Sequence, residues 1–388
     1  MGSRTAGLLW RVVMLAAFGI VASSCSLWVW GAGPPQSDTP LVVSSTGTNW
    51  ADVSAGGRTR CAVALDRTLW CWGDNDHGQV GDGTTTDVSA PTQIGTATNW
   101  ASVYVGGAHT CGRRIDSTLW CWGSNFNGQL GDGTTTDSLT PQQVGTDTDW
   151  RQVDTKSQRF FQPPLFNDGI GGTCAVKTDG SLWCWGSNVI GQLGLGATIQ
   201  VTVPTRVGTA SDWTAVAVST THSCGLRGSG DLWCWGDNTH GQLGTAGGST
   251  TVPAPVSSGW RQVDTGGGVT LANPPDPGGH TCAIDQSDAL WCWGFNVYGQ
   301  LGNGTTSDAA TPTRIGTARD WRQVSTGRSH SCAVATDSTM WCWGTNSGGE
   351  LGDGTRTPRL TPTQVGVGTD WFEVDAGAQL TIATDNDF

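Results

Sequence analysis

The residues in this chain best suited to chemistry are its cysteines, because paired thiols can form disulfides, bind metal ions or carry out redox reactions. Twelve of the thirteen fall into six pairs, and the second member of every pair lies in the tetrapeptide Trp-Cys-Trp-Gly. The two cysteines of every pair are ten positions apart, and this constant spacing predicts one structural unit copied several times. The pairs are Cys61 with Cys71, Cys111 with Cys121, Cys174 with Cys184, Cys224 with Cys234, Cys282 with Cys292, and Cys332 with Cys342.

The N-terminus decides between disulfides and metal binding. Arg4 and Arg11 precede an apolar run, Val12 to Ala22, which is too short to cross a bilayer comfortably and is typical of an export signal. We therefore expect residues 1–24 to be a signal peptide and the paired thiols to be oxidised after export. Zinc is the weaker alternative, since a structural site needs four ligands and each unit offers only two cysteines reliably.

Cys25 has no partner in the repeats. The segment Val21-Ala22-Ser23-Ser24-Cys25 resembles a bacterial lipoprotein processing site, so we predict lipidation at Cys25 and a lipid anchor to the membrane. Ordinary signal cleavage beside an incidental thiol is the alternative. Both interpretations place the protein in the bacterial cell envelope or outside the cell.

The spacing of a second motif indicates the architecture. Trp followed three residues later by Val precedes each cysteine pair, and the Trp-Cys-Trp-Gly copies recur at intervals of about fifty residues. The chain holds 58 Gly and 22 Trp, and 13% of its residues are charged. This composition favours short strands and tight turns, and a period near fifty predicts propeller blades of about four strands. In each blade the cysteines should face each other across a hairpin, with Ala62 opposite Trp70 in the first complete repeat.

The repeat Cys-Ala-Val … Leu-Trp-Cys-Trp-Gly-x-Asn-x-x-Gly-Gln-Leu-Gly-x-Gly … Pro-x-x-Val resembles that of the regulator-of-chromosome-condensation (RCC1) family, of the exported bacterial type. The resemblance covers nearly all of the chain after residue 25 and implies a seven-bladed β-propeller. Residues 25–388 would form this single domain, with repeats near 50–99, 100–149, 150–212, 213–259, 260–320 and 321–370.

The seventh blade must be assembled from the two termini. Residues 26–49 match the second half of a repeat and residues 371–388 match the first half. Val29 and Ile382 occupy the two expected cysteine positions. We therefore predict an all-β propeller whose last blade is closed by strands from both termini, with one cross-strand disulfide in each of the other six blades.

Function is expected where the repeats differ from one another. Two inserts lie between the Trp-x-x-Val segment and the following cysteine, the first from Lys156 to Asp168 and the second from Val269 to Pro277. They should emerge on the same rim, two blades apart. The first insert contains Arg and several Phe residues, and aromatic side chains and Arg often anchor interfaces. The Phe side chains of this insert could instead pack back onto the blade. The candidate binding residues are Arg159, Phe160, Phe161, Phe166, Asn273 and Asp276.

Other polar residues follow the repeat and nominate no enzyme. His109, His222, His280 and His330 share one repeat position, which favours a local hydrogen bond over catalysis. Asp82 and Asp87 resemble a calcium loop, but other repeats replace such residues freely, so turn capping is expected. We predict no catalytic residues, no metal and no cofactor.

The net charge of -12 argues against a nucleic-acid partner. We expect a monomeric, non-enzymatic scaffold that binds an unknown protein or glycan through one rim. The resemblance also implies two alternatives, a guanine-nucleotide exchange factor and a secreted β-lactamase-inhibitor-like propeller. Export argues against the first, and no residue match supports the second.

Overall fold

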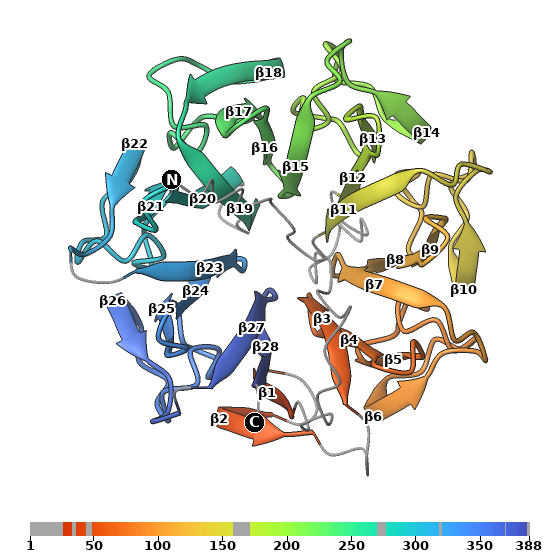
Figure 1. Cartoon of the computed structure of the whole chain (residues 1–388), viewed down its shortest axis with the longest axis horizontal. Coiled ribbons are helices and arrows are strands. Elements are labelled where there is room, and N and C mark those ends of the chain that lie inside the picture. Colours follow the sequence, from red (N-terminus) through yellow and green to blue (C-terminus); the bar gives the residue numbers. More distant parts are fainter. Residues whose placement is uncertain are drawn as a thin grey trace, which may run out of the picture.

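The computed structural model describes residues 26–32, 36–43, 49–157, 171–269, 277–317, 320–368 and 370–385. Every regular element in these ranges is a β-strand, and the strands form four-stranded antiparallel sheets. Seven such sheets surround a central axis as blades (Figure 1). The predicted all-β, seven-bladed propeller is confirmed.

We number the blades around the ring. Blade 1 contains β27, β28, β1 and β2, and blades 2 to 7 follow in chain order from β3–β6 to β23–β26. The innermost strands are β3 (Trp50–Gly56), β7 (Trp100–Val105), β11 (Trp150–Ser157), β15 (Trp213–Val218), β19 (Trp260–Val269), β23 (Trp321–Thr326) and β27 (Trp371–Ala376). The second strands are β4 (Thr59–Ala64), β8 (His109–Arg114), β12 (Gly171–Lys177), β16 (His222–Arg227), β20 (Pro277–Asp285), β24 (His330–Ala335) and β28 (Leu380–Asp385).

The Trp-Cys-Trp-Gly motif occupies the third strand of six blades, and the outer strands carry the most exposed residues. The third strands are β5 (Leu69–Gly73), β9 (Leu119–Gly123), β13 (Leu182–Gly186), β17 (Asp231–Gly236), β21 (Leu290–Gly294), β25 (Met340–Gly344) and β1 (Leu27–Gly31). The outer strands are β6 (Val88–Gln93), β10 (Ser138–Gln143), β14 (Val201–Arg206), β18 (Thr250–Ser257), β22 (Ala309–Arg314), β26 (Arg359–Gln364) and β2 (Ser37–Val42).

The six cysteine pairs form disulfides within their blades, as predicted. In each pair the cysteines lie directly opposite across the second and third strands, with a Cα–Cα distance of 4.1 Å. Ala62 opposes Trp70 in the register position beside the first bridge, which also agrees with the sequence pattern. The bridges join Cys61 with Cys71, Cys111 with Cys121, Cys174 with Cys184, Cys224 with Cys234, Cys282 with Cys292, and Cys332 with Cys342.

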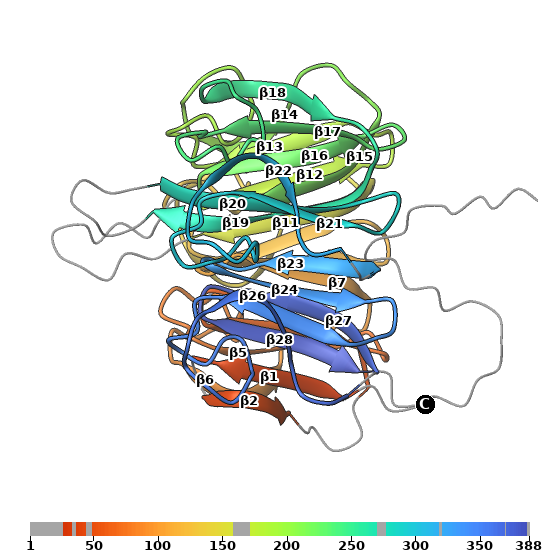
Figure 2. The ribbon, with the colours of Figure 1, turned by 90° about the vertical axis from the view of Figure 1, so that its left-hand side faces the viewer.

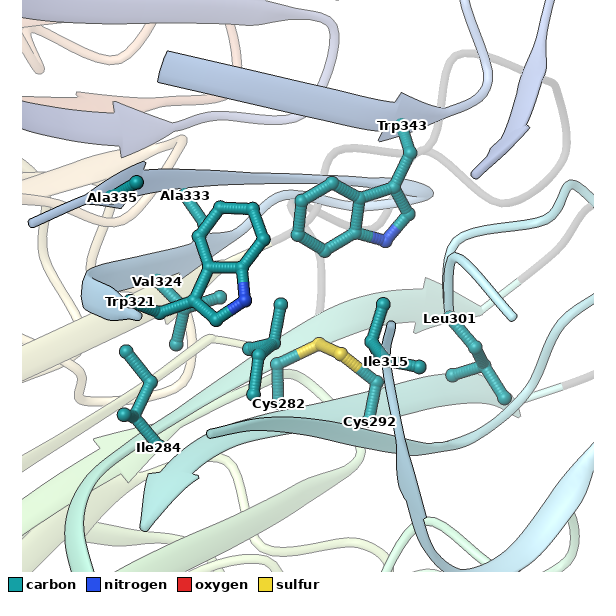
Figure 3. Close-up of a cluster of buried hydrophobic side chains, with 11 residues drawn as sticks. Cys282, Ile284, Cys292, Leu301, Ile315, Trp321, Val324, Ala333, Ala335 and Trp343 are labelled. Atoms are coloured by element: carbon teal, nitrogen blue, oxygen red, sulfur yellow. A yellow bond between two sulfur atoms is a disulfide. The ribbon is translucent and has the colours of Figure 1, made fainter. Parts of the chain in front are cut away.

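The hydrophobic core lies between neighbouring blades. In Figure 3 the Cys282–Cys292 bridge of blade 6 faces Trp321 and Trp343 of blade 7, and Val324 packs beside them. The two indole centroids are 6.4 Å apart. Because each disulfide is covered by tryptophans of the next blade, the cysteine side of one blade and the tryptophan side of the next form one buried layer.

Blade 1 is closed by strands from opposite ends of the chain. Strand β1 pairs antiparallel with β28, and Val29 lies directly opposite Ile382. Both side chains are fully buried against Trp50 and Trp72 of blade 2. The split blade predicted from the sequence is confirmed, with two apolar residues at the positions that cysteines occupy elsewhere.

We expect the double substitution Val29→Cys and Ile382→Cys to form a seventh disulfide. The two residues have the register of the natural pairs, and a bridge here would close a loop of about 350 residues, for which the chain-entropy model sets an upper bound of about 6 kcal/mol of stabilisation. Free-thiol titration and chemical unfolding under oxidising and reducing conditions would measure this. Retention of two free thiols in the folded, oxidised variant would contradict the pairing, and Val29→Cys alone is the control.

No helix in the described residues is long and apolar enough to span a membrane. Six disulfides are typical of proteins that mature in an oxidising compartment outside the cytosol.

Candidate functional site at the channel and its insert-bearing rim

The candidate binding residues and the lipidation site lie outside the described residues. Arg159, Phe160, Phe161 and Phe166 belong to the gap at 158–170, Asn273 and Asp276 to the gap at 270–276, and Cys25 precedes the first described residue. Their roles stay predictions. What the structure does describe is the pair of hairpins from which the two inserts leave the ring.

Both hairpins are longer than their counterparts. In blade 4, β11 and β12 stay paired as far as Ser157 and Gly171, and in blade 6, β19 and β20 stay paired as far as Val269 and Pro277. The extended β19–β20 pair projects beyond neighbouring strands in Figure 2. Because all seven inner strands run in the same sense around the ring, the two hairpins end on the same face, with blade 5 between them.

Charged side chains from the inner strands of three blades act on one another electrostatically. Lys156 stands where most blades have glycine, and its ammonium acts electrostatically on Asp264 of blade 6. The Asp264 carboxylate accepts hydrogen bonds from the amides of Thr326 at 2.7 Å and Thr265 at 2.9 Å. Burial raises the pKa of the Asp264 carboxyl group, although its side chain keeps partial exposure. The Lys156 ammonium and the two amide donors act against this rise.

Asp375 of blade 1 connects three blades. One carboxylate oxygen accepts from the Ser54 hydroxyl and the Ala55 amide of blade 2, each at 2.9 Å. The other accepts from the Ser325 hydroxyl of blade 7 at 3.0 Å. This buried carboxylate is thus engaged in holding the ring closed.

Glutamines of the inner strands make further connections between blades. Each amide donates to the carbonyl and accepts from the N–H of a valine on the next inner strand. The pairs are Gln152 with Val216 (2.7 and 2.8 Å), Gln262 with Val324 (2.9 and 3.0 Å) and Gln323 with Val374 (3.0 and 3.1 Å). Blade 5 has Ala215 at this position and cannot clamp blade 6 in this way.

The four equivalent histidines are buried ties between blades. The Nε2 atom of each histidine lies within hydrogen-bonding distance of a hydroxyl group on the next blade. All four of these hydroxyl groups donate their own proton to a loop carbonyl, so Nε2 must be the donor in its hydrogen bond. Burial lowers the pKa of each histidine to about 3. A hydrogen bond is present at each histidine, but it is not the local bond predicted from the sequence, because the Nε2 partner lies one blade away. The pairs are His109–Thr173 (3.0 Å), His222–Thr281 (2.8 Å), His280–Ser331 (2.9 Å) and His330–Thr381 (3.1 Å).

The loop carboxylates that resemble a calcium site cap turns. Asp87 accepts from the Asn75 amide at 2.9 Å, and Asp82 accepts from the Thr84 amide at 2.9 Å and from the Asn75 side chain at 3.2 Å. The predicted capping role is confirmed. Among the described residues, no group of three or more His, Cys, Asp or Glu side chains could hold a metal ion.

Arg60 is a buried charge that sequence reasoning did not identify. It occupies the position where the next blades have Thr or Ser, is fully buried, and donates to the Ala32 carbonyl at 3.1 Å. Burial lowers its pKa to about 10, against the attraction of Asp74. In other blades the residue at this position donates to a carbonyl of the Gly-Gln-Leu-Gly loop of the preceding blade. The short segment after Gly31 does not contain this loop. For the same reason the Trp72 indole N–H finds no acceptor among the described residues.

No active site can be seen among the described residues. The carboxylates, glutamines and histidines described above join adjacent blades, and none of these contacts combines a nucleophile with a base. A rigid ring carrying two extended hairpins on one face is instead an arrangement suited to presenting a binding surface.

Comparisons with known proteins agree with this architecture. The family profile described as the regulator of chromosome condensation (RCC1) repeat matches residues 67–112, 116–155, 179–226, 229–272, 287–334 and 337–384. A second profile of the same repeat matches residues 50–79, 100–129, 213–242 and 321–350.

Solved structures share the fold at low sequence identity. Human WBSCR16 is similar with a TM-score of 0.78 and 19% identity, covering 95% of this chain and 100% of that one. Yeast RCC1 (Prp20), solved bound to Kap60, has a TM-score of 0.77 and 17% identity, covering 100% of this chain and 97% of that one. A second structure of Prp20p from Saccharomyces cerevisiae, reported with its binding to Gsp1p and histones, has a TM-score of 0.76 and 17% identity over 98% and 97% of the two chains.

Proposed function

Because the chain belongs to the RCC1 repeat family, we propose that it is a non-enzymatic, exported propeller scaffold that binds a protein or glycan partner through one rim. The observation that carries the proposal is the pair of extended hairpins, β11–β12 and β19–β20, on the same face of the ring. A stiff ring fixes the spacing of these two stems, so the inserts they carry can contact one partner together.

Protein binding has support from the comparisons. The yeast relative is described as bound to Kap60 and as binding Gsp1p and histones, all of which are proteins. At 17% identity this likeness concerns the fold, so no residue role is carried over. A guanine-nucleotide exchange activity would require a partner on the cytosolic side, and six disulfides favour the other side.

Export and anchoring form part of the same proposal. The apolar run from Val12 to Ala22 serves as the export signal, and Cys25 carries the lipid that retains the protein at the bacterial envelope. The described chain begins at Ser26, whose amide donates to Asp385 at 2.7 Å, so an anchor at Cys25 would hold blade 1 close to the membrane. The intact mass of the mature protein distinguishes an acylated cysteine from a free thiol.

Removal of Ser157–Asp168 is expected to abolish partner binding while the ring still folds. The deletion leaves Gly169, Ile170 and Gly171 between the register pair Lys156 and Gly172, and a three-residue loop with glycine suits a β-hairpin. Affinity capture from envelope and secreted fractions, with the intact and shortened forms immobilised side by side, measures the effect. The expected result is a species retained by the intact protein only.

A matched control separates the insert from exposed aromatic surface in general. Phe126 is 51% exposed and lies in the loop between β9 and β10, on the same face, so Phe126→Ala should capture the same partner as the intact protein. Equal capture by the intact and shortened proteins would overturn the role of the first insert. Melting temperature and six intact disulfides must be shown for every form compared.

A further inference from the structure

The repeat position three residues after the first cysteine differs in charge from blade to blade. It faces the two tryptophans at the opposite rim from the inserts, the first residue of the inner strand and the first Trp of Trp-Cys-Trp-Gly. The residues at this position in blades 2 to 7 and blade 1 are Ala64, Arg114, Lys177, Arg227, Asp285, Ala335 and Asp385.

Blades 3, 4 and 5 place their own cation on this tryptophan pair. In blade 4, the Lys177 ammonium lies 4.7 Å from the Trp150 ring centre and 4.9 Å from that of Trp183. Two carboxylates of the preceding connection, Asp147 at 2.6 Å and Asp149 at 3.1 Å, complete the site. Blade 4 thus shows how this fold binds an ammonium group between two indole rings and neighbouring carboxylates. Arg114 and Arg227 lie over the equivalent rings at 3.8 to 5.4 Å.

Blade 6 has the same tryptophans and the opposite charge. Asp285 replaces the cation, and its carboxylate accepts from the Trp291 indole at 2.9 Å and from the Ser287 hydroxyl at 2.6 Å. Burial acts to raise the pKa of Asp285, but these donors together with the Ala289 amide outweigh it and lower the pKa, so the carboxylate is ionised at neutral pH. Among the described residues, no Lys or Arg lies over Trp260 or Trp291, and none forms an ion pair with Asp285.

The rings of blade 6 are also less covered. The connection into blade 5 places Ala210 against the cluster of Trp213 and Trp233. The connection into blade 6 is two residues shorter, since Pro253 precedes Trp260 by seven positions whereas Pro204 precedes Trp213 by nine. An open pocket of about 510 Å³ results, and its lining residues are Ser257, Ser258, Gly259, Trp260, Asp285, Gln286, Ser287, Trp291 and Pro312.

From this geometry we propose that the blade 6 pocket is a second binding site, which takes a lysine or arginine side chain of a protein partner. The cation would occupy the place that Lys177 takes in blade 4, against Trp260 and Trp291, with Asp285 as its counter-ion. This site lies on the face opposite the inserts, so it stands independently of the function proposed above. A shortened connection and an ionised carboxylate on two indoles are what such a side chain requires.

Titration of the folded protein with small probes tests the site. Indole N–H resonances of Trp260 and Trp291, assigned with single Trp→Phe variants, would be followed while N-acetyl-lysine methylamide or N-acetyl-arginine methylamide is added. We expect saturable shifts with a dissociation constant on the order of 1 mM, and none with the uncharged N-acetyl-norleucine methylamide. Tetramethylammonium serves as a probe for small quaternary cations.

Variants at Asp285 make the test decisive. Asp285→Asn keeps the side-chain size and should weaken lysine binding about tenfold, and Asp285→Lys should abolish it by supplying the cation from within. Asp288→Asn removes a carboxylate of the same turn that pairs with Arg261 and does not line the pocket, so it should bind normally. Equal binding of the uncharged probe, unchanged binding by Asp285→Asn, or saturation by tetramethylammonium alone would each overturn the proposal.

Discussion

Reduction of the six disulfides is expected to lower the free energy of unfolding by on the order of 10 kcal/mol. Each bridge joins cysteines ten positions apart. The loss of chain entropy in the unfolded state stabilises the fold by about 2.5 kcal/mol for a loop of this length, and six together set an upper bound near 15 kcal/mol. A loss of this size is comparable with the entire net stability of an ordinary domain.

Urea unfolding of the oxidised protein and of the reduced, alkylation-checked protein would measure the difference. The cysteine side chains are fully buried and apolar in their surroundings, so reduction leaves no large cavity and acts mainly on the unfolded chain. Single-bridge variants such as Cys224→Ala with Cys234→Ala should each lose about 2 to 3 kcal/mol. A reduced protein that unfolds at the same urea concentration as the oxidised one would contradict this account.

Blade 1 shows why the bridges are not required for blade geometry itself. Val29 and Ile382 are fully buried at the cysteine positions, and Trp50 and Trp72 of blade 2 cover them as tryptophans cover the disulfides elsewhere. The inter-blade packing is therefore the same with and without sulfur. What the six bridges add is a local restraint on each unfolded hairpin, which is absent from a blade whose strands come from opposite ends of the chain.

The sequence was sufficient to predict the strand pairing within each repeated blade. Cysteine spacing and period-two alternation placed Cys61 opposite Cys71 and Ala62 opposite Trp70, because both features depend only on neighbouring strands. Completion of a half repeat at each terminus predicted the pairing of Val29 with Ile382. These inferences rest on local geometry that every copy of the unit must share.

Contacts between blades could not be predicted in the same way. The partner of His109 is Thr173, which lies 64 positions away, and no periodicity within one blade identifies it. The two-residue shortening before Trp260 is visible in the sequence, but its effect depends on what would have covered the indoles. Arg60 is intelligible only once its neighbour is known to lack the Gly-Gln-Leu-Gly loop. The insert residues predicted to bind a partner lie outside the described residues.

Mild acid is expected to destabilise the propeller through its four buried histidines. Burial lowers the pKa of His109, His222, His280 and His330 from 6.5 to about 3 in the folded protein. The unfolded chain therefore binds protons first as the pH falls below about 6.5, and stability declines from there towards pH 3. At pH 5.5 each histidine costs about 1.4 kcal/mol relative to high pH, so the four together cost about 5 to 6 kcal/mol.

Urea unfolding between pH 8 and pH 5 would give the slope of stability against pH. Replacing all four histidines by Gln, which can still donate to the hydroxyl of the next blade, should flatten the profile in this range. The double variant His77→Gln and His240→Gln is the matched control, because those two are half-buried and lie beside Asp137 and Asp308. The control should keep the steep slope of the parent protein, and a parent profile that is already flat would contradict the account.

Other titrating groups do not account for a loss of stability between pH 6.5 and 5.5. Hydrogen bonds from Thr68, Thr118 and Ser181 lower the pKa of Asp66, Asp116 and Asp179, so their contributions are lost only at pH values near 4 and below. Burial raises the pKa of Asp264 and Glu350, and their protonation opposes the loss as the pH falls. A steep decline between pH 6.5 and 5.5 would therefore identify the histidine ties, each of which joins one blade to the next, as the acid-labile contacts of the ring.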